Sequence, residues 1–361
     1  QRRGVAVYDG YRESLRSVVD DLSPDLALIA YWRNAERCLP VIRATSPGTR
    51  VLVDSVDLHF VREARATFHA RSETWLGVTI RQAQNIGREL SAYAASDGVL
   101  TVSSQEAEML ESLLWTKYRA FVVPDFEEFE PSSVAFGQRR GSLLVGSFQH
   151  PPNVESARYL ICDILPLVDT QLLRKHPVNV VGNKLGADIR ALGADLPAVR
   201  MVGWVPEVEP YLSSARVNLV PLLHGAGTKR KLVMALATGT PTVSTSIGVE
   251  GLDLVDQEHV LVADDAPSFA RAIERLLSDE VLWRRLREAG LAHVHQTHDR
   301  ATALASLGVA VEQVLAEAPR RIVPAGLDSI PDPVAAPLAN GALPQIAPAI
   351  TDSTSAARDV V

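Results

Sequence analysis

Short apolar runs alternate with longer amphipathic stretches along most of this chain. The runs are rich in branched residues and bounded by polar ones, which is typical of buried strands. The first half contains the runs Leu26–Tyr31, Val51–Val53, Gly98–Val102 and Phe121–Val123. The second half contains the runs Ser142–Gly146, Val178–Gly182, Val199–Gly203, Val217–Pro221, Thr242–Thr245 and Val260–Val262. Because strands that alternate with helices form parallel sheets with helical crossovers, we expect a doubly wound α/β fold.

The length of the chain predicts two domains. It contains 361 residues, and a domain usually has about 100–200. We expect a first domain over residues 1–137 and a second over residues 138–300. The polar segment 123–141 has no apolar periodicity and therefore predicts a linker between them.

Amphipathic patterns predict where the longer helices lie. Residues 61–95, with scattered Arg, Glu, Gln and Ala, predict a helix in the first domain. Residues 266–278 and 281–292 predict two helices that close the second domain, and residues 301–318 predict a further C-terminal helix. Residues 319–361 are rich in Pro and Ala, so we expect a flexible tail or a linker there.

Composition excludes several classes of protein. The net charge of -7 argues against general affinity for nucleic acid, and no apolar run approaches the roughly 18 residues of a membrane helix. Two distant cysteines, Cys38 and Cys162, do not suggest a disulfide framework, so we expect a cytoplasmic protein with at most peripheral membrane contact. The chain begins at Gln1 without an initiator Met, and we therefore expect an incomplete first domain and further sequence upstream.

A glycine- and lysine-rich stretch, GAGTKRK, stands between a predicted strand and a predicted helix. The start of a helix presents free N–H groups and a partial positive charge, which attract an anion. Gly225 and Gly227 allow the backbone to approach that anion, Thr228 is placed to cap the helix or to donate a hydrogen bond, and Lys229 and Lys231 add charge. The pattern indicates a diphosphate site, although a solvated loop before a helix gives the same local pattern.

Several motifs follow one another in a recognisable order over residues 142–294, among them LLVGSFQHPPNVE, VVGNKLG, VRMVGWVPEVEPYL and GAGTKRKLVMALATGTPTVSTSIGVEGL. In this order they resemble the nucleotide-binding domain of family 4 glycosyltransferases, which have the GT-B fold. The first half resembles the acceptor-side domain of that family more loosely, in VLVDSVDLHFVREAR and ELSAYAASDGVLTVSSQEAEML. The resemblance implies two Rossmann-like domains that face each other across a cleft, with a sugar nucleotide held mainly by the second.

The resemblance also implies roles for particular residues of the second domain. It places the donor diphosphate on the glycine- and lysine-rich stretch described above, and it puts the nucleotide and sugar cleft beside Gly146, Ser147 and Phe148. His150, Pro151 and Asn153 belong to the same motif. For Pro151 and Asn153 we expect only a turn and a helix cap.

In the first domain, the stretch VDSVDLHF ends a predicted strand with polar side chains, Asp54, Asp57 and His59. Ligands of parallel sheets lie beyond the carboxyl ends of the strands, so we expect these side chains to face the cleft. The resemblance implies that His59 is the catalytic residue, in contact with the transferred sugar or with the acceptor. Arg62 is a candidate for neutralising the leaving diphosphate.

The chain departs from the family at one position. The family motif EAMAxGxPV carries a glutamate that holds the ribose, and this chain has Met234 there. A thioether is a weak acceptor and cannot replace a carboxylate. An earlier family glutamate falls on Ala226, so two interpretations compete: Glu250 substitutes as the cleft carboxylate, or the chain no longer turns over sugar nucleotides.

We therefore expect a retaining glycosyltransferase that transfers a sugar from a nucleotide diphosphate sugar to a glycan, lipid-linked or protein acceptor. The alternatives are a catalytically silent GT-B module that binds a partner or a glycan, and a GT-B epimerase. We expect no cofactor and no metal, since the lysines supply the charge. The acidic run 125–130 and the cluster His293, His295 and His298 lack a metal-like context, so we expect them to be solvated. Protein partners or further domains beyond the termini are compatible with this interpretation.

Overall fold

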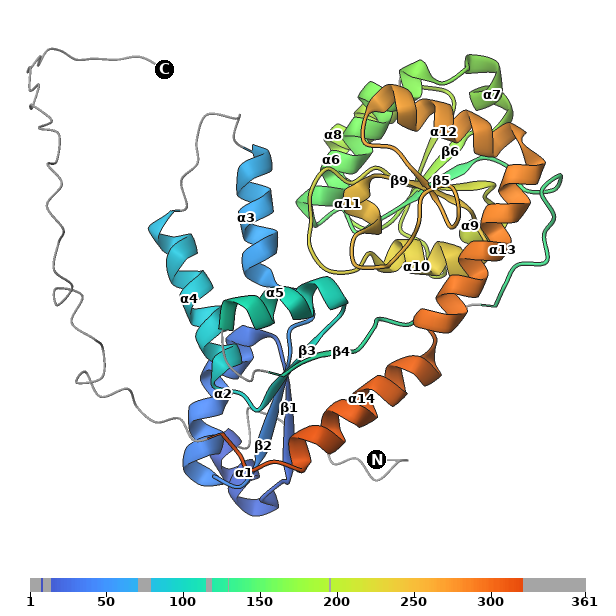
Figure 1. Ribbon diagram of the computed structural model, residues 1–361. Coiled ribbons are helices and arrows are strands. Elements are labelled where there is room, and N and C mark those ends of the chain that lie inside the picture. The colour runs from blue at the N-terminus through green and yellow to red at the C-terminus, as the bar shows by residue number, and fades with distance from the viewer. Residues whose placement is uncertain are drawn as a thin grey trace, which may run out of the picture. The chain divides into compact units, whose positions relative to one another are not determined.

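The computed structural model describes residue 8 and residues 14–70, 79–114, 119–128, 130–194 and 196–320 (Figure 1). Two parallel sheets with flanking helices make up this part of the chain. Residues 321–361, which make up most of the predicted tail, lie outside the described residues. In the part that is described, no helix combines the length and the apolar character needed to cross a membrane.

The first sheet has the strand order β1-β2-β3-β4. Its strands are β1 (Leu26–Ala30), β2 (Arg50–Asp54), β3 (Gly98–Thr101) and β4 (Ala120–Val122). Its helices are α1 (Leu15–Leu22), α2 (Trp32–Thr45), α3 (His59–Ala70), α4 (Ile80–Ala94) and α5 (Ser104–Leu114). Trp32, Val53 and Tyr93 belong to the buried core between the sheet and these helices. The predicted strands of the first half are confirmed.

The prediction of one helix over residues 61–95 is wrong, because the structure contains two helices, α3 and α4, in this stretch. Thr79 is the N-cap of α4, and its side chain and that of Gln82 form a reciprocal capping box. Such a box fixes a helix start by satisfying free N–H groups on both sides, and the Thr-x-x-Gln spacing was its signal in the sequence.

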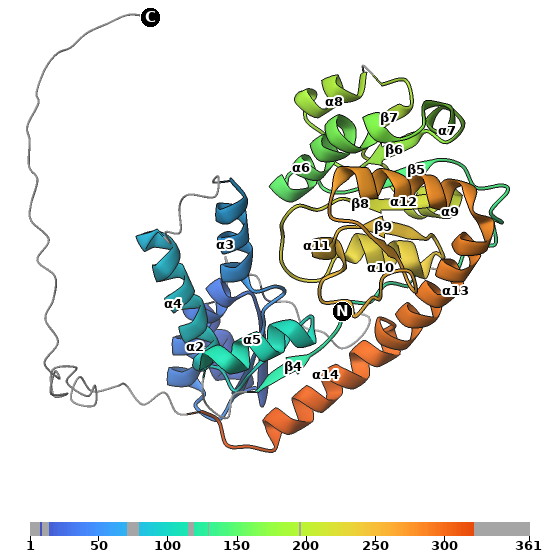
Figure 2. The ribbon, with the colours of Figure 1, turned by 45° about the horizontal axis from the view of Figure 1, so that its top comes forward.

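Helix α14 (Arg300–Leu315) packs on the first sheet, although it follows the second domain in the sequence. Figure 2 shows it running from the end of α13 toward the strands of the first sheet. Ala310 and Val314 are almost fully buried against Leu52 and Leu100. The helix expected as a separate C-terminal element is therefore part of the first domain's core.

The second sheet has the strand order β10-β9-β8-β5-β6-β7, and all its pairs are parallel. Its strands are β5 (Ser142–Val145), β6 (Val178–Val181), β7 (Val199–Gly203), β8 (Val217–Val220), β9 (Thr242–Ser244) and β10 (Leu261–Val262). Its helices are α6 (Pro151–Tyr159), α7 (Thr170–Lys175), α8 (Ala187–Ala194), α9 (Glu209–Ser214), α10 (Arg230–Ala237), α11 (Ser246–Val249), α12 (Ala266–Ser278) and α13 (Glu280–Thr297). All six predicted strands of this half are confirmed.

The strand order changes direction at β5. The chain builds β6 and β7 on one side of β5 and then crosses to build β8 on the other side. In open α/β sheets, ligands bind beyond the carboxyl ends of the strands at such a switch point. The loops that follow β5 and β8 are therefore the natural ligand loops of this domain.

Candidate active site

The loop after β5 depends on two glycines that allow close approach of the backbone. A Cβ on Gly146 would lie 2.9 Å from Cγ of Asn153, and a Cβ on Gly182 would lie 1.7 Å from the carbonyl oxygen of Gly146. Asn153 then holds the loop by donating from Nδ2 to the carbonyl oxygen of Ser147 at 2.9 Å. The side chain of Phe148 is buried in the core, and the expectation that this residue borders the cleft stays a prediction.

The loop after β8 carries the glycine- and lysine-rich stretch. Helix α10 begins at Arg230 and has Lys229 as its N-cap, one residue after Thr228, the cap that the sequence offered. Thr228 does not cap the helix, because its hydroxyl donates to Oδ2 of Asp125 at 2.6 Å. Gly225 and Gly227 have φ values of 149° and 66°, which glycine adopts far more easily than other residues.

The two lysines of this loop are held by neutral oxygen atoms. The ammonium of Lys229, a residue only 7% exposed, donates to the carbonyl oxygen of Gly227, and that of Lys231 donates to Oδ1 of Asn153. Burial lowers the pKa of each lysine to about 8, and the charge of Lys229 lowers the pKa of Lys231 further. Within the described chain, neither ammonium makes an ion pair. The site thus contains two cations without an ion-pair partner, although the charges of Glu250, Glu106 and Asp57 act on Lys229 and raise its pKa.

Asn153 is the residue of this site that the sequence analysis missed. It was expected only to serve a turn and cap, whereas its amide joins the β5 loop to Lys231. Pro151 is at the first position of α6, which agrees with the structural role expected for it, and His150 is the N-cap. The position of Asn153 within the HPPN motif was the available signal.

In the first domain, His59 begins α3 and is 6% exposed. Its Nδ1 accepts a hydrogen bond from Nε1 of Trp32 at 3.1 Å, so the neutral ring carries its hydrogen on Nε2. Nε2 lies 3.2 Å from Oδ1 of Asp57. Arg62, whose side chain is 44% exposed, donates to both oxygens of Asp57, at 3.0 and 2.7 Å, and the three side chains form one polar group.

Glu89 supports this group from α4. Its carboxylate accepts from the backbone N–H groups of His59 and Phe60 at 2.8 and 2.9 Å and from the hydroxyl of Tyr93 at 3.0 Å. A carboxylate at a helix N-terminus satisfies free N–H groups and interacts favourably with the helix dipole. Burial nevertheless raises the pKa of Glu89 to about 7.

The structure brings the predicted residues of both domains together. Arg65 of α3 donates to the carbonyl oxygen of Gly225 at 2.8 Å and forms a bidentate ion pair with Glu250. A Cβ on Gly227 would lie 3.0 Å from Cβ of Asp57. Both carboxylate oxygens of Glu250 are thus paired with Arg65. The interpretation that Glu250 replaces the family glutamate did not anticipate this ion pair.

Met234, at the position of that glutamate, has an apolar environment. It packs against the cluster of Leu143, Val181, Leu212, Ala215 and Ala235, beside Val145 and Val205. A methionine suits such surroundings because its side chain is flexible and apolar.

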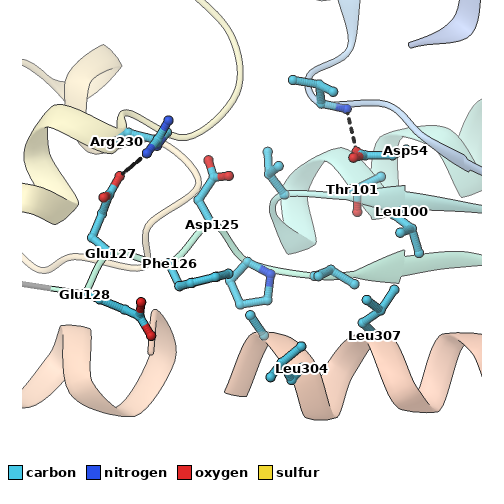
Figure 3. Close-up of a pocket in the computed structure, with 15 residues that line it drawn as sticks. Asp54, Leu100, Thr101, Asp125, Phe126, Glu127, Glu128, Arg230, Leu304 and Leu307 are labelled. Carbon is cyan, nitrogen blue, oxygen red and sulfur yellow. Dashed lines mark hydrogen bonds and ion pairs between the residues drawn. The ribbon is translucent and has the colours of Figure 1, made fainter. Parts of the chain in front are cut away.

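A pocket of about 630 Å³ lies at the carboxyl ends of β2, β3 and β4 (Figure 3). Figure 3 shows Asp54 and Thr101 on the strand side of the pocket and Leu304 and Leu307 of α14 on the helix side. The segment Val123–Glu128 forms a further wall.

The prediction that the acidic run is solvated is wrong for two of its members. Asp125 accepts from Thr228, and Glu127 pairs with Arg230 at 2.7 Å with its side chain only 10% exposed. The linker therefore contacts the ligand loop of the second domain.

The prediction that the histidine cluster is solvated is confirmed for His295, which is exposed, and wrong for His298. His298 is only 5% exposed, and its ring centroid lies 6.3 Å from that of His293. Burial lowers the pKa of His298, and so does the charge of His293. Among the residues described, no three His, Cys, Asp or Glu side chains are grouped so as to hold a metal ion.

Residues 139–279 match the family model of glycosyl transferases group 1. The chain is also similar to LpsE of Rhizobium meliloti, a lipopolysaccharide core biosynthesis glycosyltransferase. The two are 34% identical over 110 residues, which make up 30% of this chain and 31% of LpsE. The match thus spans about a third of the curated relative.

Solved structures of other proteins share the fold. Sucrose-phosphate synthase of Thermosynechococcus elongatus has a TM-score of 0.65 at 18% identity, over 84% of this chain and 77% of that chain. Anabaena HepE, solved with UDP and glucose, has a TM-score of 0.63 at 12% identity, over 85% of this chain and 84% of HepE. A glycosyltransferase of Rickettsia africae has a TM-score of 0.63 at 10% identity, over 87% of this chain and 85% of that chain.

The fold and the ligand loops define a protein of the GT-B class, as the sequence resemblance implied. The family match adds that residues 139–279, most of the second domain, are similar to the glycosyl transferases group 1.

Proposed function

We propose that the protein is a retaining glycosyltransferase that uses a nucleotide diphosphate sugar as donor. One observation carries this proposal: at the switch point, the buried Lys229 and the half-buried Lys231 are hydrogen-bonded to neutral oxygen atoms, and the pKa of each is lowered to about 8. Buried cations without a paired anion are costly unless a ligand supplies the negative charge. A diphosphate is an anion of suitable charge.

The same two lysines suit the chemistry of the leaving group. Negative charge develops on the diphosphate as the glycosidic bond breaks, and cations fixed near it lower the barrier. The free N–H groups at the start of α10 add partial positive charge. Because the protein supplies this charge itself, we expect no metal requirement.

The first domain would act on the sugar. His59 and Asp57 lie beside Gly227, so they are placed next to the proposed diphosphate loop. The Trp32 hydrogen bond fixes the tautomer of His59, and Oδ1 of Asp57 lies 3.2 Å from Nε2 of the ring. We propose that His59 contacts the transferred sugar or the acceptor, and the family resemblance supports retention of configuration.

The 630 Å³ pocket is the proposed acceptor site. Four carboxylates line it, those of Asp54, Asp125, Glu127 and Glu128, and they face the single cation Arg230 among its described lining residues. Like charges repel, so an uncharged glycan hydroxyl suits this pocket better than a phosphate-bearing acceptor. The apolar side chains of Leu304 and Leu307 offer a surface for the face of a sugar ring.

Comparison with known proteins supports the enzyme over the silent module. The matching family model describes glycosyl transferases, LpsE is a glycosyltransferase, and HepE was solved with UDP and glucose. The test is release of nucleoside diphosphate from UDP-, GDP- and ADP-glucose by the wild type, by Lys229→Ala and by Lys175→Ala. Lys175 is exposed at the end of α7, before β6, and serves as the matched control. We expect release by the wild type and the control and a loss of at least tenfold in Lys229→Ala. No release from any donor would contradict the proposal.

A further inference from the structure

A second, smaller pocket of about 310 Å³ lies directly against the proposed diphosphate loop. Its lining residues come from α3, from the start of α5 and from two loops of the second domain: Val61, Arg65, Ser103, Gln105, Glu106, Met109, Ala226, Gly227, Glu250 and Gly251. Ligand pockets usually measure about 300–1,000 Å³. A pocket at the lower limit suits a single sugar ring better than an oligosaccharide.

Glycines make the walls of this pocket possible. Gly251 has a φ of 76°, and a Cβ on it would lie 3.0 Å from Cβ of Ser103. Gly227, with a φ of 66°, similarly approaches Asp57. A side chain at either glycine would force the second domain's loops away from the first domain and change the pocket.

Glu106 is the unexplained group in this pocket. It is 8% exposed, and its Oε1 accepts from the backbone N–H of Leu58 at 3.3 Å. Its Oε2 is also buried and makes no hydrogen bond of normal geometry within the described residues, although the backbone N–H of Val102 is near enough to lower the pKa of this carboxylate. Buried polar atoms in folded proteins almost always have a partner, so an exception that lines a pocket points to a ligand atom.

The other charged groups of the pocket are already satisfied. Arg65 is neutralised by Glu250 through two hydrogen bonds. Glu106 is therefore the only lining group, among those described, that combines a charge with an unused oxygen. A carboxylate oxygen accepts hydrogen bonds and repels anions, so it favours a neutral hydroxyl group over a sugar carboxylate.

We infer that this pocket receives the transferred sugar of the donor, and that Glu106 is a specificity-determining residue that accepts a hydrogen bond from one hydroxyl group of a neutral sugar. The inference rests on the proposed function, since the donor's diphosphate must bind beside Lys229. It assigns sugar recognition to the first domain, at a helix that the sequence analysis did not single out.

The test compares binding of a nucleoside diphosphate with binding of its sugar derivative. UDP, UDP-glucose and UDP-glucuronate, or the corresponding series of the best-bound nucleotide, are titrated into the wild type and into Glu106→Gln by calorimetry at pH 8. This pH lies above the pKa of about 7 that burial gives Glu106, so the carboxylate of the wild type is ionised. Glutamine keeps the size of the side chain and an acceptor for Leu58 N–H, and Glu108→Gln on the exposed face of α5 is the matched control.

We expect Glu106→Gln to bind UDP within twofold of the wild type but UDP-glucose at least fivefold more weakly. We also expect it to lose most of the preference for UDP-glucose over UDP-glucuronate. Met109→Trp, which adds volume to the pocket wall, should likewise weaken UDP-glucose and spare UDP. Unchanged UDP-glucose affinity in both variants would overturn the inference alone. Absence of nucleotide binding by the wild type would overturn the proposed function and this inference together.

Discussion

Arg65 and Glu250 form a bidentate ion pair, in which Nη2 of Arg65 lies 2.6 Å from Oε1 of Glu250. Arg65 also donates to the carbonyl oxygen of Gly225 and so connects α3 with the proposed diphosphate loop. Each partner is only partly buried, with about 30% of its side chain exposed. The pair therefore joins the two predicted halves of the site while it keeps the carboxylate of Glu250 occupied.

From this relationship we expect Lys229→Ala to weaken binding of a nucleoside diphosphate more than Glu250→Ala does. Lys229 would lose a charge-assisted hydrogen bond worth about 1.5–3 kcal/mol, or roughly 10- to 100-fold in affinity. Loss of Glu250 removes a negative charge near the anion site and frees Arg65, so its effect should be below about threefold. Calorimetric titration of a nucleoside diphosphate into both variants compares the two losses of affinity. Equal affinities for wild type and Lys229→Ala would contradict the diphosphate site.

Stability should depend on pH through Glu106. Burial, together with the charge of Asp57, raises the pKa of Glu106 from 4.5 to about 7 in the folded protein. A raised carboxyl pKa contributes stability below pH 4.5, and this contribution is lost as the pH rises through 7. Glu106→Gln cannot titrate at this position. Its free energy of unfolding, relative to that of the wild type, should therefore be about 1–3 kcal/mol higher at pH 8 than at pH 5.

Urea unfolding at the two pH values measures this difference. Glu108→Gln, on the exposed face of the same helix, should show none. A Glu106→Gln variant whose stability relative to the wild type is the same at pH 5 and pH 8 would show that the buried carboxyl group titrates normally.

Met234→Glu should lower the melting temperature without tighter nucleotide binding. The new carboxylate would lie against Leu143, Val181 and Val205 and lose hydration without a partner. We expect a loss of about 1–3 kcal/mol, whereas Met234→Leu should cost less than about 1.5 kcal/mol. Tighter binding in Met234→Glu would instead show that the ribose site survives and lacks only its carboxylate.

Helix α14 should stabilise the first domain. Val314 is 2% exposed against Leu52 and Leu100, so Val314→Ala should cost about 2 kcal/mol from two lost methyl-sized groups and the cavity they leave. Leu315 on the same helix is 38% exposed, and Leu315→Ala should cost clearly less. Thermal unfolding of the two variants compares them directly, and equal losses would contradict the packing.

Local patterns in the sequence predicted the local structure well. All the expected strands are present, because short branched runs bounded by polar residues specify buried strands. The motif order gave the GT-B class. The break between α3 and α4 was missed because the apolar pattern continues across it, although the Thr79 capping box was visible.

Contacts between distant segments could not be predicted from the sequence. Nothing local shows that α14 returns to the first sheet, that Asp125 meets Thr228, or that Asn153 holds Lys231. Patterns of period 2 or 3.6 report only which face of an element is buried, and they do not say which distant side chain lies opposite. For the same reason the sequence did not show that Arg65 pairs with Glu250.

The central claim is that Lys229 and Lys231 form a diphosphate site, and proton uptake on binding tests it most directly. At pH 8, lysines with a pKa of about 8 are about half protonated, and a bound diphosphate should raise their pKa values and draw in about one proton in total. Calorimetric titration of UDP, GDP and ADP in buffers of different ionisation enthalpy measures this uptake. We predict that at least one nucleotide binds with uptake near one proton, and that Lys231→Met reduces the uptake by about half. Binding without buffer dependence, or no binding of any of the three, would contradict the account.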